Sequence, residues 1–138
     1  MATKEVYYLT YVDAVLIHIL LMRKAGETRF GAFDRNLIES ALARPHHAAA
    51  YEGADLIRQA ALLCHSLIKN HPWVGGNKRT ATAILRSFLR RNGKRLVSPV
   101  EEVVDMVLAI EADRWSIDEL EAWVRQHVVP LEEKLGLQ

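Results

Sequence analysis

Residues 55–69 form the segment that most restricts how this chain can fold. Drawn as a helix, the segment is apolar on almost every side, and a narrow polar stripe remains: Arg58, Gln59, Ser66 and Lys69. A helix that is apolar nearly all round must be covered by other elements on nearly all sides. We therefore predict a central buried helix here, with the rest of the chain packed around it.

Helical periodicity recurs along the rest of the chain, without the alternating pattern of a strand. Serine or threonine followed three residues later by an acid marks a capping box at Thr10, Ser98 and Ser116. The helices expected besides the central one cover about residues 11–24, 34–44, 77–92, 99–110 and 116–129. Six helices with short connections predict an all-α, compact single domain over residues 1–138.

Local residue preferences set the expected helix ends. The residue before a proline avoids the α region, so the second helix is expected to stop at Arg44 and Pro45. Residues 46–53 then become an irregular flap, and its adjacent histidines are not expected to bind zinc, because neighbours in sequence rarely reach one metal. Asn77 is expected to cap the fourth helix and Gly93 to end it in the left-handed conformation.

The stretch between the third and fourth helices reads Asn-His-Pro-Trp-Val-Gly-Gly-Asn-Lys-Arg-Thr-Ala over residues 70–81. Its two glycines permit positive φ and close approach of a ligand to the backbone. The unpaired amides at the start of the next helix are a suitable site for an anion. Lys78 and Arg79 lie in that first turn, where the helix dipole disfavours cations by about 0.3–1 kcal/mol each. We infer that the loop binds an anion.

His71 is the one side chain of this stretch that can exchange a proton near neutral pH. It is either a functional base or a cation that interacts with the C-terminal dipole of the central helix. Trp73 is expected to anchor the loop in the core rather than to stack on a base. Arg79, Arg86 and Arg90 share one face of the fourth helix. Arg86, Arg90 and Arg91 are either solvated charges or a surface that binds a partner.

Charge is distributed unevenly, although the net charge is only +1. Nine Lys or Arg residues and no acid lie between Asp55 and Glu101, whereas ten acids face three Lys or Arg from Glu101 onward. The two segments either pair across the surface, or the basic one is a cationic face for phosphates or an acidic partner. Charge alone leaves nucleic-acid binding open, but we do not expect direct binding to nucleic acid.

Composition places the chain among ordinary globular proteins, with 50% hydrophobic and 25% charged residues. The longest apolar run, residues 14–22, is shorter than the roughly 18 residues that a membrane span needs. The polar N-terminus lacks the apolar segment of a signal peptide, so we expect a cytoplasmic protein without a membrane partner. Cys64 is the single cysteine, which excludes an internal disulfide.

The loop matches neither the Walker pattern nor the dinucleotide-binding glycine pattern. It resembles the signature of the Fic/Doc superfamily, H-P-F-x-[D/E]-G-N-x-R. The lysine before the arginine, followed by Thr-Ala, is typical of the Doc (death-on-curing) toxins of toxin–antitoxin systems. Residues 37–45, Asn70 and residues 88–93 also resemble this family, so the resemblance covers about residues 8–128. The residues that match the signature are His71, Pro72, Gly76, Asn77 and Arg79, while Trp73 stands at the Phe position and Lys78 at the open position before the arginine.

The resemblance implies a fold, a reaction and partners. Family members are compact and all-α, and their histidine acts as general base on a target hydroxyl; carried over, His71 is the catalytic residue. The phosphates of ATP, held with Mg²⁺, would lie against Gly76, Asn77, Lys78 and Arg79. The lysine favours a kinase that phosphorylates a translation factor, elongation factor Tu, over the AMP transfer of Fic enzymes. The family also implies a cognate antitoxin whose disordered segment folds onto the toxin.

Gly75 departs from the signature, because the family places Asp or Glu there to hold Mg²⁺. Three explanations remain open: an inactivating substitution made so that a toxic protein could be expressed, a natural member with weak or no activity, or metal held by phosphates and water alone. Two functions of different classes follow. The chain is either a phosphotransferase or a catalytically impaired module that binds nucleotide or an antitoxin segment.

Overall fold

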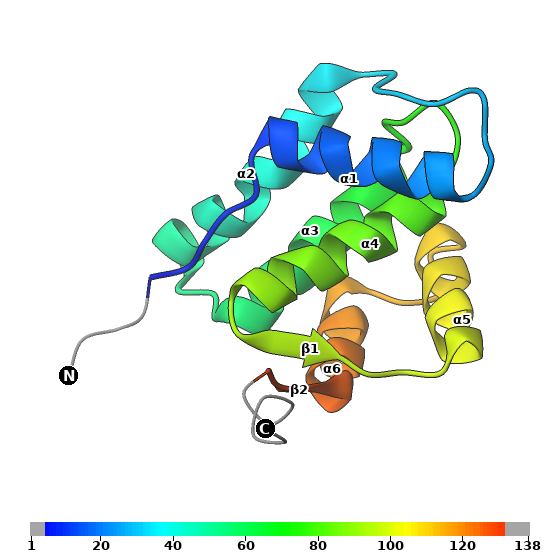
Figure 1. The fold of residues 1–138 in the computed structure, drawn as a ribbon. Coiled ribbons are helices and arrows are strands. Elements are labelled where there is room, and N and C mark those ends of the chain that lie inside the picture. The colour runs from blue at the N-terminus through cyan, green and yellow to red at the C-terminus, as the bar shows by residue number, and fades with distance from the viewer. Residues whose placement is uncertain (1–4, 132–138) are drawn as a thin grey trace, which may run out of the picture.

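The computed structural model describes residues 5–131. Its helices are α1 (Tyr11–Lys24), α2 (Arg35–Glu52), α3 (Leu56–Asn70), α4 (Asn77–Arg91), α5 (Val100–Glu111) and α6 (Ile117–His127). Two short strands, β1 (Lys94–Leu96) and β2 (Val128–Pro130), pair antiparallel. Figure 1 shows α3 and α4 side by side, with α1 and α2 on one side of them and α5 and α6 on the other. The predicted all-α fold is confirmed.

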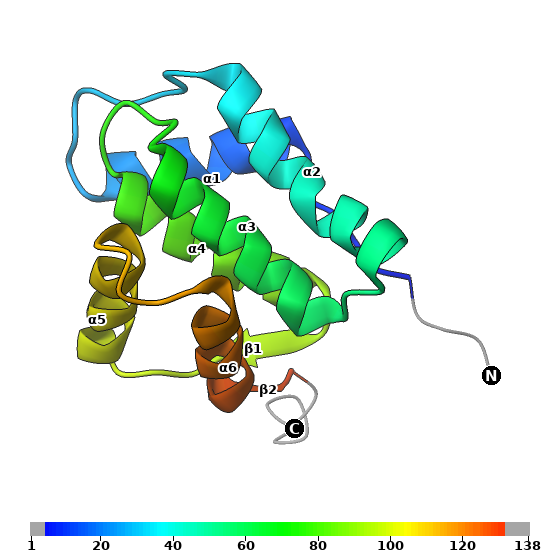
Figure 2. The ribbon, with the colours of Figure 1, turned by 180° about the vertical axis from the view of Figure 1, so that it is seen from behind.

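α3 is the central helix, as its composition predicts. It packs against α2, α4, α5 and α6, and Figure 2 shows it from behind, running between α2 and the α5–α6 pair. Full burial of a large apolar side chain contributes about 1.5–3 kcal/mol, so this packing supplies most of the driving force for the fold. The core side chains include Leu63, Leu67 and Ile68 of α3, Ile84, Leu85 and Phe88 of α4, Met106 and Ile110 of α5, and Leu120 and Val124 of α6.

The predicted stop of the second helix at Pro45 is wrong. α2 continues through Pro45 to Glu52 and ends at Gly53, which has a φ of +67°. A proline inside a helix loses one backbone hydrogen bond and costs about 3 kcal/mol. Pro45 is buried, however, together with Ala41 and Ala48 on the face that packs against α3, and this packing outweighs the local preference. The predicted irregular flap is therefore helical.

Three smaller expectations also differ from the structure. The N-cap of α4 is Gly76 rather than Asn77. Ser98 forms no capping box, because its hydroxyl donates to the carbonyl of Pro99, which is itself the N-cap of α5. The strands were not expected, since three residues each are too few to show alternation. The capping boxes at Thr10 and Ser116 and the positive φ of Gly93 are confirmed.

Part of the basic segment pairs with the acidic one. Arg58 of α3 contacts Asp118 and Glu121 of α6, at 2.6 and 3.1 Å, and Lys69 contacts Asp113 at 2.7 Å. These ion pairs join the central helix to the C-terminal ones. Arg91 pairs with Asp13 at 3.4 Å, and Arg86 donates a hydrogen bond to the carbonyl of Leu96 at 3.1 Å. No ion pair of Arg79, Arg86 or Arg90 occurs within residues 5–131. Over the same residues, no helix is long and apolar enough to cross a membrane.

Candidate functional site

His71 lies at the turn where α3 ends. It is the C-cap residue and has φ +46° and ψ +55°, a left-handed conformation that is strained for a residue with a Cβ. Such strain costs of order 1–3 kcal/mol and is often kept where a side chain must be presented. The imidazole is 47% exposed and therefore accessible to a reactant.

Gly75 and Gly76 complete the turn with φ of +78° and +63°. A Cβ on Gly76 would lie 2.4 Å from the sulfur of Met22, so the end of the Met22 side chain would have to shift, and the φ of +63° disfavours a side chain there as well. A Cβ on Gly75 would meet only the carbonyl oxygen of Arg29 at 3.7 Å and the methyl group of Met22 at 3.8 Å. The site of the absent carboxylate therefore has room for a side chain, and only the positive φ opposes one.

Asn77 fixes the loop through its side chain. The amide oxygen accepts from the backbone N–H of Trp73 at 2.9 Å, and the amide nitrogen donates to the Trp73 carbonyl at 3.0 Å. Trp73 itself is 3% exposed, so it is a core anchor as expected. With one side-chain hydrogen bonded to the Trp73 carbonyl, Asn77 retains its backbone N–H and the second hydrogen of its amide nitrogen as donors.

The start of α4 retains the features of an anion site. No side chain caps the helix, and the first backbone bond inside it runs from Thr80 N–H to the carbonyl of Gly76. The amides of Asn77, Lys78 and Arg79 therefore precede the first helical hydrogen bond. The cationic side chains of the last two are exposed at the same turn. Amides, dipole and cations together favour a bound anion.

His18, on α1, packs against the loop and forms hydrogen bonds with residues on either side of it. Its Nε2 accepts from Gly31 N–H at 2.9 Å, so the neutral ring carries its proton on Nδ1, which lies 2.8 Å from the Thr80 hydroxyl. The ring stacks on Trp73 with centroids 4.4 Å apart. Burial lowers the pKa of His18, because the charged form loses its hydration. Sequence reasoning missed this role, although a histidine on the buried stripe of α1, between Ala14 and Met22, was a usable signal.

The segment before α2 is tied to the same loop. Ala32 forms a β-bridge with Trp73, Val74 N–H donates to the Gly31 carbonyl, and Phe33 N–H donates to the Pro72 carbonyl. Together with His18, these contacts join the residues before α2, the loop and α1 into one unit. The conformation of the loop is therefore set by tertiary contacts on three sides.

Glu111, the last residue of α5, brings a carboxylate to the site. Its Oε2 lies 3.5 Å from His71 Nε2, and its Oε1 lies 3.4 Å from Lys78 Nζ. It does not replace the absent acid, because a side chain on Gly75 would face Met22 and Arg29. Residues 5–131 contain no group of three or more His, Cys, Asp or Glu side chains that could hold a metal. The protein groups at this loop do not form a Mg²⁺ site.

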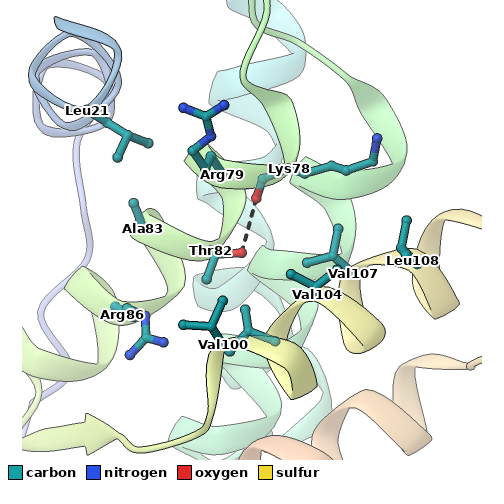
Figure 3. Close-up of a pocket in the computed structure, with 11 residues that line it drawn as sticks. Leu21, Lys78, Arg79, Thr82, Ala83, Arg86, Val100, Val104, Val107 and Leu108 are labelled. Carbon is teal, nitrogen blue, oxygen red and sulfur yellow. Dashed lines mark hydrogen bonds between the residues drawn. The ribbon is translucent and has the colours of Figure 1, made fainter. Parts of the chain in front are cut away.

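An apolar groove of about 390 Å³ runs beside the loop, between α4, α5 and Leu21 of α1. Figure 3 shows the valines of α5 and Leu108 along one wall, and Lys78, Arg79 and Arg86 on α4. Val100, Val104 and Leu108 are 73%, 48% and 42% exposed. They lie four residues apart and form one apolar stripe on α5. The groove thus combines an apolar wall with basic groups.

These features define an all-α protein with a strained histidine beside an uncapped, cationic helix start. The chain belongs to the Fic/DOC family, whose model matches residues 8–89, from the segment before α1 almost to the end of α4. It is similar to Toxin Doc of Mycolicibacterium smegmatis (strain ATCC 700084 / mc(2)155), with 38% identity over 67% of this chain and 80% of that protein. α5, including Glu111, lies beyond the residues that the family model matches.

Proposed function

We propose that this protein is a Doc-like toxin of a type II toxin–antitoxin system, which transfers the γ-phosphoryl group of ATP to a hydroxyl of a translation factor. Elongation factor Tu is the substrate that the family resemblance favours. One observation carries the proposal: a half-exposed histidine lies beside open amides and cations at the start of α4. Such a toxin acts where translation takes place, which makes the cytoplasm its proposed location.

The roles follow from the chemistry of each group. His71 is the general base that takes the proton of the acceptor hydroxyl, since a nitrogen of its half-exposed imidazole can accept that proton. The backbone amides of Gly76 and Asn77 and the cations of Lys78 and Arg79 hold the phosphates. Fixed amides and cations stabilise the charge that develops in phosphoryl transfer. Transfer of AMP, as in Fic enzymes, is the alternative reaction at the same site.

Mg²⁺ is the component that the protein groups do not fit, because Gly75 offers no oxygen ligand. The roles above therefore involve no metal ligand from the protein. The backbone leaves space for a carboxylate at this position, so Gly75→Asp is the variant in which activity is expected to rise.

The test is transfer of label to purified elongation factor Tu, with ATP labelled at either the γ- or the α-phosphate. We expect γ-label on the factor, more of it with Gly75→Asp, and none with His71→Ala. Label from the α-phosphate would show AMP transfer instead. Absence of both labels with Gly75→Asp would exclude the phosphotransferase and favour a binding module.

A second candidate function, antitoxin binding without catalysis, is favoured by the groove. An amphipathic helix with an acidic side suits an apolar wall next to Lys78, Arg79 and Arg86. Binding of the cognate antitoxin segment should not require nucleotide, and Val104→Asp in the groove should weaken it at least tenfold. Val12→Asp is the control, because Val12 is 64% exposed on α1 and does not line the groove. Equal losses for both variants would place the partner elsewhere.

A further inference from the structure

A second groove, of about 380 Å³, lies between α2 and α3, the two helices that Figure 2 shows side by side. The polar residues that α2 contributes recur every three or four positions, at Ser40, Arg44, His47 and Tyr51, and therefore share one face of that helix. Leu62 of α3 lines the other wall. This α2–α3 groove shares no lining residue with the apolar groove between α4 and α5.

The α2–α3 groove leads away from the loop that contains His71. α2 begins beside this loop, because the backbone N–H of Asp34 donates to the carbonyl of Pro72 at 3.1 Å. Further along α2, Arg44 Nη1 donates to Ser66 Oγ of α3 at 3.0 Å. Ser66 precedes His71 by five residues, a rise of about 7.5 Å along the helix axis. A polypeptide with a hydroxyl at His71 can therefore reach Arg44 within a few residues.

The positive charge of Arg44 has no acidic partner, because it forms no ion pair within residues 5–131. His65, on the neighbouring turn of α3, is affected by this charge. Burial lowers the pKa of His65, the cations of Arg44 and Lys69 lower it further, and only Asp113 acts in the opposite direction. The acid that lines the groove, Glu52, lies about 12 Å from Arg44 along α2. A carboxylate from a partner would find an open cation here.

Tyr51 offers an apolar contact farther along the same face of α2. Its ring is 86% exposed and lies edge-on to His47, with centroids 6.3 Å apart. Tyrosine and arginine are the residue types that often anchor protein interfaces. The α2–α3 groove thus presents one cation near the loop and one aromatic ring beyond it.

We propose that the α2–α3 groove docks the acceptor protein, through the polypeptide segment next to the hydroxyl that is phosphorylated. A carboxylate of this segment pairs with Arg44 while the hydroxyl lies at His71. An extended chain advances about 3.3 Å per residue, so the acid should stand about two to four residues from the hydroxyl. The inference rests on the proposed function and adds a sequence preference for the acceptor. The acceptor is the occupant that fits, since the groove begins at the proposed general base.

Phosphorylation of synthetic peptides by the Gly75→Asp protein with γ-labelled ATP tests the preference. Each peptide carries one central threonine and one glutamate in an Ala/Gly background, with the glutamate placed one to seven positions away on either side. We expect kcat/KM to be highest with the glutamate at positions two to four. Arg44→Gln should raise the KM of the best peptide about two- to fivefold and leave kcat unchanged, the change that a partly exposed ion pair implies. Arg90→Gln is the matched control, because Arg90 is also an exposed arginine but does not line the groove, and its KM should not change.

Nuclear magnetic resonance of the His65 ring detects docking without turnover, and the absence of its signal in His65→Gln identifies it. The best peptide should raise the pKa of His65, because its carboxylate offsets the charge of Arg44, and a peptide without glutamate should not. Phosphorylation that depends neither on the position of the glutamate nor on Arg44 would overturn the docking and leave the phosphotransferase intact. An Arg44-dependent rise in the pKa without transfer of label would support the docking and contradict phosphoryl transfer. Neither label nor a rise in the pKa would overturn the docking as well.

Discussion

Replacement of His18 by phenylalanine tests how the loop is held. Phenylalanine has a similar size and keeps an aromatic ring against Trp73, but it removes the contacts to the Thr80 hydroxyl and to Gly31 N–H, at 2.8 and 2.9 Å. Thr80 is fully buried, so its hydroxyl cannot turn to water. An unpaired buried polar group costs about 1–3 kcal/mol, and the partly exposed Gly31 amide adds about 0.5–1.5 kcal/mol. We expect a total loss of about 2–4 kcal/mol.

Urea unfolding followed by circular dichroism measures this loss. His18→Phe should lower the urea midpoint with little change in slope. Adding Thr80→Val should recover about 1–2 kcal/mol, because removal of both polar partners leaves no unpaired group. The control is Thr82→Val, since Thr82 Oγ1 is exposed and donates only to the carbonyl of Lys78. If His18→Phe is as stable as the wild type, or if Thr80→Val fails to restore stability, His18 does not support the loop in this way.

The pH dependence of the same variant provides a second readout. Burial lowers the pKa of His18 below its usual value, so the folded state favours the neutral ring. The unfolded state therefore binds more protons than the folded state at mildly acidic pH. The stability that the neutral His18 contributes is fully present above the unfolded pKa of about 6.5. It is lost as the pH falls from there through the pKa of the folded state. Between pH 7.5 and 5.0, the wild type should therefore lose more stability than His18→Phe. Equal losses would contradict the buried, neutral imidazole.

Further predictions concern the loop itself. Gly75→Asp should raise phosphotransfer, and it should lower the free energy of unfolding by about 1–2 kcal/mol because the φ of +78° disfavours any side chain. Label transfer measures the first effect and urea unfolding the second. Unchanged phosphotransfer activity would refute the first. Asn77→Ala should cost about 1–3 kcal/mol through the loss of two hydrogen bonds to Trp73, as measured by urea unfolding. Asn77→Asp keeps the acceptor and should lose less; an equal loss would contradict the bidentate role.

Sequence patterns predicted the elements whose signals are local. The composition of α3 required cover on all sides, and the capping boxes at Thr10 and Ser116 fixed two helix starts. Pro45 misled the prediction, because the packing of α2 against α3 outweighed the lost backbone bond. Local rules describe a chain segment in isolation, and they fail where tertiary packing supplies several kilocalories per mole.

The candidate site likewise contains features that are local in sequence and residues that only tertiary packing brings together. The glycines, the open amides and the adjacent cations are consecutive in sequence, so the sequence alone was enough to predict an anion site at this loop. Glu111 and His18 lie 40 and 53 residues from His71 along the chain, and only the packing of α5 and α1 brings them to the loop. A search for acids near the loop in sequence could not find Glu111. Its carboxylate is identified by its contacts in space.

The transfer of γ-label from ATP to elongation factor Tu tests the proposed activity most directly. The protein should be compared as Gly75→Asp and as Gly75→Asp with His71→Ala, in the presence of Mg²⁺. The predicted result is one phosphoryl group on a hydroxyl side chain of the factor with the first form and none with the second. Phosphorylation that persists without the imidazole would contradict the role of His71, and no phosphorylation by either form would contradict the assignment of this loop as a phosphoryl-transfer site.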